Sequence, residues 1–436
     1  MDTLFSNVTI VTMNEKLDVL FGAYLAVTDG KITYIGTTAP EGQPKTIVDG
    51  TGMVAMPGLV NCHTHLATTL MRGFLDDASR AEALEQQLQR EAKLDNRSVK
   101  ASALLGIAEA LRFGTTAVSD LYYYPDAVAE AVAESGIRGN IALASYRFID
   151  QNEDFDFETD EQCVEAVRVA DKWHGYEDRI RIDAGLQAEY ISNYKLWEGL
   201  AAWAREQGLG LQLHLAETQA EADSCLDRTG LGVAELLNAH RLFVPGTAAT
   251  GCVALSEEER KLLGKHKVSA VTTPIANAKA GLPVTPVVDL VKAGMNVSLG
   301  TGGPLECGNL DLFEVMRATA MAARSAGGDA NTMPASAVLM MATVCGARAQ
   351  GRGDRAGMLK EGMDADIVLV DFTAPHLMPC HDVMNALVFS AKGGDVALTM
   401  VGGKILYQNG AFPTIDLKGV VSELMEYGIP RLMEKE

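Results

Sequence analysis

Two histidines, His63 and His65, stand two residues apart at the end of an apolar stretch that begins at Met56. In an extended strand, side chains at positions i and i+2 point to the same side. Both imidazoles can therefore face one point, as the ligands of a metal ion must. Two histidines in a polar loop would show the same spacing, so the pair alone does not define a metal site.

A third histidine, His214, ends another apolar stretch, and Glu217 follows it at His-x-x-Glu spacing. An acid at this place also suits the start of a helix, where the helix dipole favours negative charge. Considered together, three histidines at two strand ends and a nearby carboxyl group predict a zinc or iron site. Glu217 is the catalytic candidate of this group, because a positioned carboxyl group can move protons.

The middle of the chain contains the strands that would bring these side chains together. Short apolar runs alternate there with helical patterns, as parallel strands joined by helices require. The predicted strands are residues 54–60, 115–120, 140–145, 179–186, 209–214, 247–253, 268–273 and 296–300. Eight strands, each followed by a helix, predict an α/β fold of the (β/α)8 TIM-barrel type, whose catalytic groups lie at the strand ends. A doubly wound open sheet is the alternative.

Both ends of the chain are rich in short strands and turns. The pairs Asp29-Gly30 and Asn409-Gly410 are typical of hairpins. We therefore expect a small β-sandwich built from both chain ends, residues 1–55 with 356–420, beside a barrel domain at residues 56–355. Residues 421–436 are expected to form a C-terminal helical tail.

The composition is that of a globular protein, with 47% hydrophobic and 22% charged residues. The net charge of −20 disfavours nucleic acid and anionic membranes as partners. We find no run of about 18 apolar residues that would predict a membrane span, and no signal peptide is expected. The seven cysteines are scattered without a C-x-x-C pair, which indicates a reducing compartment. We expect a cytoplasmic protein that binds a small molecule.

Motifs along nearly the whole chain point to one family. They are residues 56–65, 71–74, 76–77, 113–117, 119–122, 214–218, 308–314 and 360–371. In combination they resemble the amidohydrolase superfamily, and most closely its branch of 5-methylthioadenosine/S-adenosylhomocysteine deaminases and triazine chlorohydrolases. The resemblance implies that His63, His65 and His214 bind one divalent metal ion, zinc. It also implies that Glu217 passes a proton to a ring nitrogen of the substrate, and that the protein is a homodimer or larger homo-oligomer.

Two groups that the resemblance leads us to expect are missing. The family normally has a histidine at the end of the sixth strand, where this chain has Gly251. It also has an aspartate after the eighth strand that serves as metal ligand and general base, where this chain has Gly302. Gln187 stands where the deaminase branch usually has a substrate-contacting histidine. Loss of a general base alone typically slows a reaction by about 10²–10⁴-fold.

Two functions are therefore open. One is a divergent, deaminase-like hydrolase that acts on C–N bonds of a purine nucleoside or related nitrogen heterocycle, with an atypical metal site. The alternative is a catalytically impaired or non-hydrolytic descendant that binds a ligand. Glu306 and Cys307 follow the eighth strand and are candidates to replace the missing acid, although an exposed loop acid is the simpler expectation for Glu306. Further candidates for the substrate pocket, each equally compatible with a loop or salt-bridge role, are Arg72, Asp76, Asp77, Arg147, Tyr190, Gln187, Gly251 and Gly302.

Overall fold

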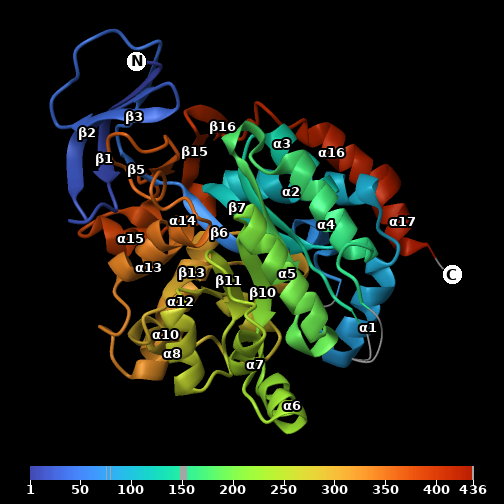
Figure 1. Ribbon diagram of the computed structural model, residues 1–436. Helices are drawn as coiled ribbons and strands as arrows, with labels where there is room; N and C mark the ends of the chain where they lie inside the picture. Colours follow the sequence, from blue (N-terminus) through green and yellow to red (C-terminus); the bar gives the residue numbers. More distant parts are fainter. Residues whose placement is uncertain (75, 79, 148–154, 435–436) are drawn as a thin grey trace.

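Eight parallel strands form the centre of the molecule in the computed structural model, which describes residues 1–436 except 75, 79, 148–154 and 435–436 (Figure 1). They pair in chain order, so that each strand lies between its sequence neighbours. The strands are β6 (Leu59–Thr64), β7 (Thr115–Tyr122), β8 (Arg138–Leu143), β9 (Ile180–Leu186), β10 (Leu211–Leu215), β11 (Thr247–Gly251), β12 (Ser269–Thr272) and β13 (Asn296–Leu299).

The first and last of these strands meet, which turns the sheet into a barrel. Gly302, just after β13, donates its backbone N–H to the carbonyl oxygen of His63 over 3.0 Å. The backbone N–H of Thr301 donates to the Asn61 side chain over 3.1 Å. The predicted (β/α)8 barrel is thereby confirmed. These contacts bring the two ends of the sheet together beside His63.

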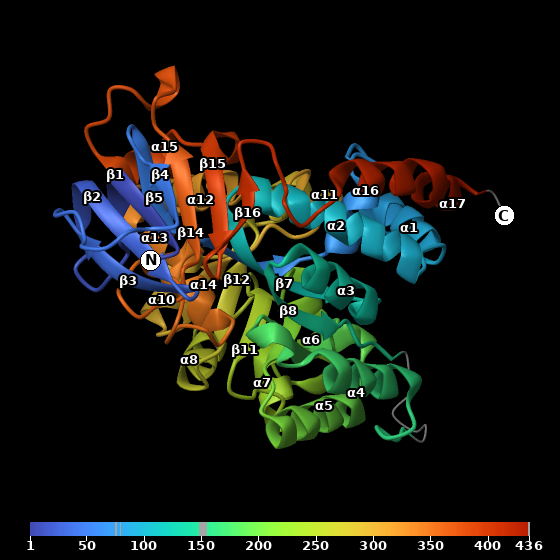
Figure 2. The same ribbon diagram turned by 90° about the horizontal axis from the view of Figure 1, so that it is seen from above.

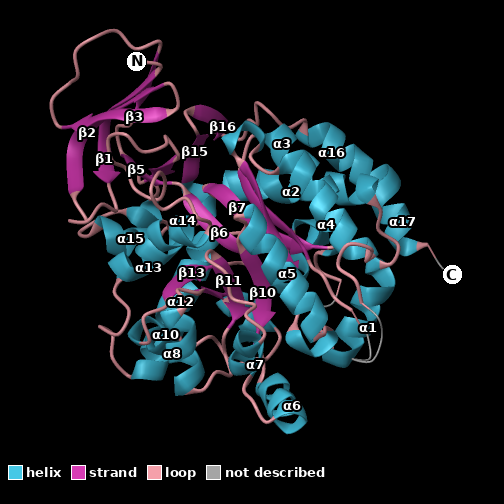
Figure 3. Cartoon of the chain, viewed as in Figure 1, coloured by secondary structure: helices cyan, strands magenta, loops and turns pink. Residues whose placement is uncertain are grey.

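Helices cover the outside of the barrel, which explains why its strands are apolar on both faces (Figure 3). Every residue of β7, for example, is buried. In α4, the residues that face the strands recur at helical spacing, and the carboxylate of Asp160 caps the first turn. The helices of this part are α1 (Arg80–Glu91), α2 (Asn96–Arg112), α3 (Pro125–Ser135), α4 (Glu161–Trp173), α5 (Tyr194–Gln207), α6 (Gln219–Thr229), α7 (Val233–Ala239), α8 (Glu257–Lys265), α9 (Pro274–Lys279), α10 (Val287–Lys292), α11 (Pro304–Cys307), α12 (Leu312–Gly327), α13 (Ala335–Ala342) and α14 (Val344–Ala349).

The first barrel strand begins later than the sequence predicts. The stretch expected to be one strand, residues 54–60, is divided between β5 (Met53–Pro57), which belongs to a different sheet, and β6. Pro57 has no N–H to donate, and Gly58 donates instead to the carbonyl oxygen of Asp366 over 3.0 Å. Both segments are apolar and buried, so periodicity cannot separate them. As a result, His63 lies within β6 rather than in a loop after it.

Both chain ends contribute to the second sheet, as predicted. Its strand order is β16-β15-β14-β5-β1-β2-β3, with β4 paired to β1. A core of its own includes Phe5, Ile10, Leu25, Ile367 and Leu398. The strands are β1 (Thr3–Val11), β2 (Val19–Thr28), β3 (Lys31–Gly36), β4 (Thr46–Asp49), β5, β14 (Ile367–Asp371), β15 (Val396–Val401) and β16 (Lys404–Gln408).

The chain ends in helices that lie beside α2, which also contacts β15 and β16 of the second sheet (Figure 2). They are α16 (Leu417–Glu423), η6 (Leu424–Gly428) and α17 (Ile429–Met433), while α15 (Val383–Phe389) precedes β15. Arg97 of α2 pairs with Glu423 over 2.5 Å. Within the described residues, no helix combines the length and apolarity that a membrane span needs. The expected domain limits, 1–55 with 356–420, 56–355 and 421–436, stay a prediction.

Candidate metal centre

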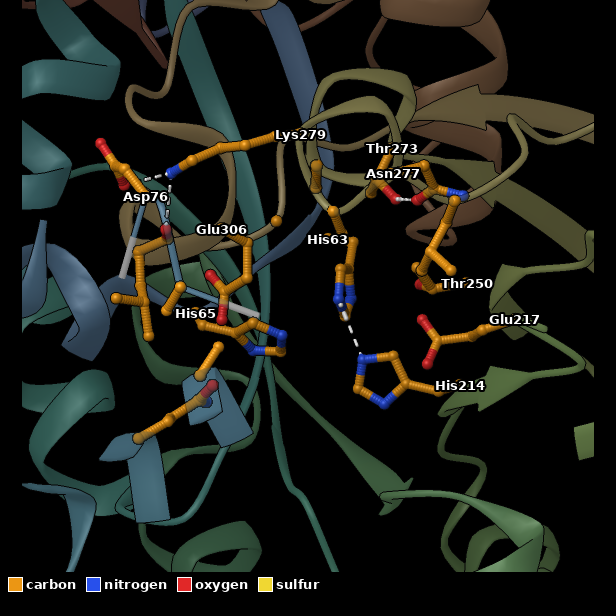
Figure 4. A pocket seen from close by; sticks show the side chains of 18 residues that line it. His63, His65, Asp76, His214, Glu217, Thr250, Thr273, Asn277, Lys279 and Glu306 are labelled. Carbon is orange, nitrogen blue, oxygen red and sulfur yellow. Dashed lines mark hydrogen bonds and ion pairs between the residues drawn. The ribbon is translucent and has the colours of Figure 1, made fainter. Parts of the chain in front are cut away.

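Three histidines meet at the carboxyl ends of β6 and β10 (Figure 4). The Nε2 atoms of His63 and His214 lie 3.2 Å apart. One ring nitrogen from each of His63, His65 and His214 lies within 4.8 Å of the others. Two nitrogens bound to tetrahedral zinc at about 2.0–2.1 Å would be separated by about 3.3 Å. The donor set therefore fits a divalent ion such as zinc.

Main-chain carbonyl groups orient two of these rings. The Nδ1–H of His65 donates to the carbonyl oxygen of Leu121, and that of His214 donates to the carbonyl oxygen of Gln187, each over 2.8 Å. Since a carbonyl oxygen can only accept, the proton sits on Nδ1 and leaves Nε2 with a lone pair. This is how metal-binding histidines are commonly held. Gln187 thus contributes to the site through its backbone.

Burial favours the neutral form of His63 and His65 in the absence of an ion. It holds the pKa of His63 well below its usual range, with smaller effects from His65 and His214. It also lowers the pKa of His65 to about 3, again with the neighbouring His214 adding to the effect. Neutral imidazole is the form that binds a metal ion, because the ion and a proton compete for the same lone pair.

Asp120, at the end of β7, fixes the backbone of the histidine pair. Its carboxylate accepts hydrogen bonds from the backbone N–H of Leu66 over 2.6 Å and from the Thr64 hydroxyl over 3.0 Å. Burial raises the pKa of Asp120 to about 7. The segment 119–122 carried part of the family resemblance, but the role of Asp120 was missed. An acid at the end of an otherwise apolar strand was the signal for it.

The histidines open onto a cavity of about 270 Å³. Glu217 and Glu306 line it on opposite sides of the histidines, and the carboxyl group of Glu306 is turned towards His65 (Figure 4). At the rim, Lys279 Nζ pairs with Asp76 over 2.6 Å. The lining also includes polar residues that sequence reasoning did not select, namely Gln87, Thr250, Thr273, Asn277 and Lys279.

The candidate pocket residues separate into two groups. Asp76, Gly302 and Glu306 line the cavity, whereas the others are not among its lining residues. Arg72 pairs with Glu109 and donates to the carbonyl oxygen of Gly308 over 2.5 Å. The remaining candidates outside the lining are Arg147, which pairs with Asp160 over 3.1 Å, Tyr190, which is 54% exposed, Asp77, which is exposed, the Gln187 side chain and Gly251.

Comparison with known proteins identifies the family of this chain. A model of the Amidohydrolase family matches residues 54–406. The chain is 37% identical to the 5'-deoxyadenosine deaminase of Methanosarcina acetivorans over 424 residues, covering 97% of this chain and 96% of that protein. The chain belongs to the amidohydrolase family. This amidohydrolase is also 35% identical to the 5-methylthioadenosine/S-adenosylhomocysteine deaminase of Moorella thermoacetica over 427 residues, covering 97% of each.

Solved structures agree with this assignment. An adenosine deaminase from Xanthomonas campestris with bound zinc has a TM-score of 0.93 and 28% identity, covering 99% of this chain and 98% of that one. The zinc-bound atrazine chlorohydrolase of Arthrobacter aurescens has a TM-score of 0.89 at 24% identity, covering 97% and 99%. The latter likeness supports the fold alone.

Glu217 owes its position to two neighbours in this amidohydrolase. It precedes α6, and the buried carboxylate of Glu221 accepts hydrogen bonds from the backbone N–H groups of Ala216 and Glu217 over 3.1 and 2.8 Å. Burial raises the pKa of Glu221 to about 7. The Thr218-x-x-Glu221 spacing, typical of a helix start, was the signal for this missed residue. The second neighbour is Gly251, whose lack of a side chain leaves room for the Glu217 side chain.

The two glycines at positions where the family resemblance leads us to expect larger side chains, Gly251 and Gly302, differ in the space around them. Gly251 and Gly302 have φ angles of 98° and 75°, in the region that favours glycine. A Cβ at Gly251 would lie 2.7 Å from Glu217 Cγ and 3.0 Å from the Leu215 carbonyl oxygen. A Cβ at Gly302 would meet Ala276 Cβ at 3.5 Å and nothing closer, which is an ordinary contact. Space for a side chain therefore exists at Gly302 and not at Gly251.

Glu306 is not the exposed loop acid that was the simpler expectation. It lies in α11, and among the described residues its Oε2 atom is buried without a hydrogen-bond partner. Burial raises the pKa of Glu306 to about 8. The short turn after Pro304 brings the side chain back towards the histidines, a reversal that the sequence pattern did not reveal.

Proposed function

We propose that this amidohydrolase is a metal-dependent hydrolase that removes the amino group from the purine ring of an adenine nucleoside. One observation carries the proposal: His63, His65, His214 and Glu217 line one cavity, and the three rings can share an ion. The relatives named as deaminases of 5'-deoxyadenosine and of 5-methylthioadenosine or S-adenosylhomocysteine support the substrate class. The zinc in the adenosine deaminase neighbour supports zinc as the metal.

Each residue of the site has a task in this reaction. The three histidines would hold a divalent ion, which when bound makes water a better nucleophile near neutral pH. The carbonyl groups of Leu121 and Gln187 keep two of the rings in place. Glu217, held by Glu221, gives a proton to the ring nitrogen of the substrate. Water adds to the ring carbon and the C–N bond breaks. Of the two water protons, one replaces the proton that Glu217 has given to the ring nitrogen, and the other ends on the departing ammonia.

A non-hydrolytic, ligand-binding protein is the second candidate function. Gly251 and Gly302 favour it, because the side chains that the family resemblance leads us to expect there would polarise and deprotonate the attacking water. In that case the cavity and the histidines would bind a nucleoside without ammonia release.

Zinc content and ammonia release from 5'-deoxyadenosine test the proposal. We expect the wild-type protein to hold one zinc ion and to release ammonia. His214→Ala should lose both the ion and the activity. Glu217→Gln should keep the ion but turn over about 10²–10⁴-fold more slowly, since the proton donor is gone. Glu314→Gln, at an exposed position of α12, is the matched control and should behave as wild type.

Two outcomes would decide against the deaminase. A wild-type protein that holds no zinc and releases no ammonia from adenosine-type compounds contradicts it. A protein that binds a nucleoside tightly without ammonia release supports the ligand-binding function instead.

Light scattering of the purified protein tests the homodimer or larger homo-oligomer that the family resemblance implies.

A further inference from the structure

Gly303 is a glycine for reasons of space. Its φ angle of −84° is one that any residue adopts. A Cβ there, however, would lie 2.1 Å from Thr68 Oγ1, 2.5 Å from Glu306 Oε2 and 2.9 Å from His65 Cβ. The absence of a side chain at residue 303 therefore allows the Glu306 carboxyl group to lie beside His65 (Figure 4).

One oxygen of the Glu306 carboxyl group lacks a hydrogen-bond partner in this position, within the part of the chain that the structure describes. Its Oε2 atom is buried without a hydrogen bond among the described residues. Lys279, a cation on the same cavity, is engaged by Asp76 over 2.6 Å and by the Leu305 carbonyl oxygen over 3.0 Å. A buried carboxylate with an unpaired oxygen is costly, and binding to a metal ion is one way to offset that cost.

The three histidines, in turn, supply no negative charge to a metal ion. His63, His65 and His214 are neutral donors, so they leave the two positive charges of a divalent ion unbalanced. The family resemblance leads us to expect an aspartate for this purpose at residue 302, where this chain has glycine. We propose that Glu306 supplies the anionic group of the metal site in place of that aspartate, an inference that rests on the proposed metal-dependent function.

Other groups near the histidines are less suited to this role. Cys307, the second candidate from the sequence, directs its Sγ to the carbonyl oxygens of Asn309 and Gly303 over 2.8 and 3.0 Å. Glu91 accepts a hydrogen bond from the Tyr122 hydroxyl over 2.8 Å. Glu217 lies on the opposite side of the histidines, where the proposed function already uses it (Figure 4).

Zinc affinity provides a readout that does not depend on turnover. We would measure it for the full-length protein by competition with a chromophoric chelator. Glu306→Gln keeps the shape of the side chain and removes its charge, so we expect a folded protein that binds zinc about 10–100-fold more weakly. Glu314→Gln removes one acid at an exposed site of the same chain and should leave the affinity unchanged. Melting of the metal-free proteins checks that both variants are folded.

A second change tests whether the two positions are equivalent. Gly302→Asp, combined with Glu306→Gln, returns a carboxylate to the position that the family resemblance indicates. Residue 302 has room for a Cβ, and aspartate is among the residues that tolerate its positive φ. We therefore expect the double variant to recover most of the zinc affinity that Glu306→Gln loses.

The outcomes separate this inference from the function on which it rests. If the wild-type protein binds zinc and Glu306→Gln binds it equally well, Glu306 is not the anionic group, while the deaminase proposal stands. If the wild-type protein binds no zinc, both are overturned. Weaker binding by Glu306→Gln that Gly302→Asp restores supports the inference even if the preferred nucleoside has not been found.

Discussion

At the scale of single residues, a side chain added at position 251 is expected to disturb the site rather than to restore it. Gly251→His would introduce the side chain that the family resemblance leads us to expect, but its Cβ would collide with Glu217 Cγ. The left-handed backbone alone costs about 1–2 kcal/mol for such a residue. We therefore expect Gly251→His to melt at a lower temperature than wild type and to release ammonia more slowly, because Glu217 is displaced.

Gly302→Asp is the matched comparison, because its backbone is also left-handed but its surroundings are open. It should cost about 1 kcal/mol or less, since aspartate tolerates this conformation. Thermal melting and ammonia release should therefore separate the two variants clearly. A Gly251→His protein more active than wild type would contradict this account of Glu217.

The sequence predicted the residues of this site unevenly. His63, His65 and His214 could be identified because each stands at the end of an apolar stretch. Asp120 and Glu221 were missed, because both act by accepting hydrogen bonds from backbone N–H groups. Asp120 binds the N–H of Leu66, which is distant in sequence, and Glu221 binds N–H groups of the turn before α6. The sequence did not reveal that Glu306 is buried. Its burial depends on the direction of α11, a helix of four residues that is too short to show a periodic pattern.

At the scale of elements, α12 begins with a buried acid whose effect depends on pH. The Asp311 side chain accepts hydrogen bonds from the backbone N–H groups of Phe313 and Gly393, each over 2.8 Å. Burial raises the pKa of Asp311 to about 6. The folded protein therefore holds this proton more tightly than the unfolded chain, and the contribution to stability falls as the pH rises from about 4 to about 6.

Asp311→Asn should remove this pH dependence without removing the helix cap, since asparagine caps equally well. Relative to the variant, wild type should lose up to about 3 kcal/mol of stability between pH 4 and pH 7. Urea unfolding of both proteins across this range measures the difference. If the two stability curves run parallel, the buried carboxyl group is not the cause.

Strands were predicted best where one apolar run in the sequence corresponds to one strand of the structure. The predicted strands 268–273 and 296–300 agree with β12 and β13 to within one residue at each end. The division of residues 54–60 between β5 and β6 could not be predicted, because a strand that leaves one buried sheet for another keeps the same apolar character. The change of sheet is instead determined by partners more than 300 residues away, in β14.

At the scale of the whole molecule, a buried ion pair connects the barrel to the second sheet. Arg138 of β8 binds Asp366 over 2.7 Å and Asp364 over 3.1 Å, and all three side chains are at most 5% exposed. Asp366 also accepts a hydrogen bond from the backbone N–H of Gly402 over 2.7 Å. These contacts hold β14 and the turn before β16 against the base of the barrel.

Asp366→Ala should therefore destabilise the protein by about 3–5 kcal/mol, because it leaves Arg138 incompletely paired in a buried place. Urea denaturation measures this loss. Glu15→Gln is the control: Glu15 pairs with Lys360 at an exposed site, and its replacement should not change stability measurably. An effect of Asp366→Ala as small as that of the control would mean that the two parts are held together by other contacts.

The orientation of His65 and His214 by backbone carbonyl groups has a consequence for how this protein can change over time. A carbonyl group is present whatever the side chain, so residues 121 and 187 can be replaced without loss of the hydrogen bonds to the rings. Gln187 is an instance, since the family resemblance leads us to expect a histidine there. Mutations can thus accumulate at these two positions while the rings of His65 and His214 stay in place.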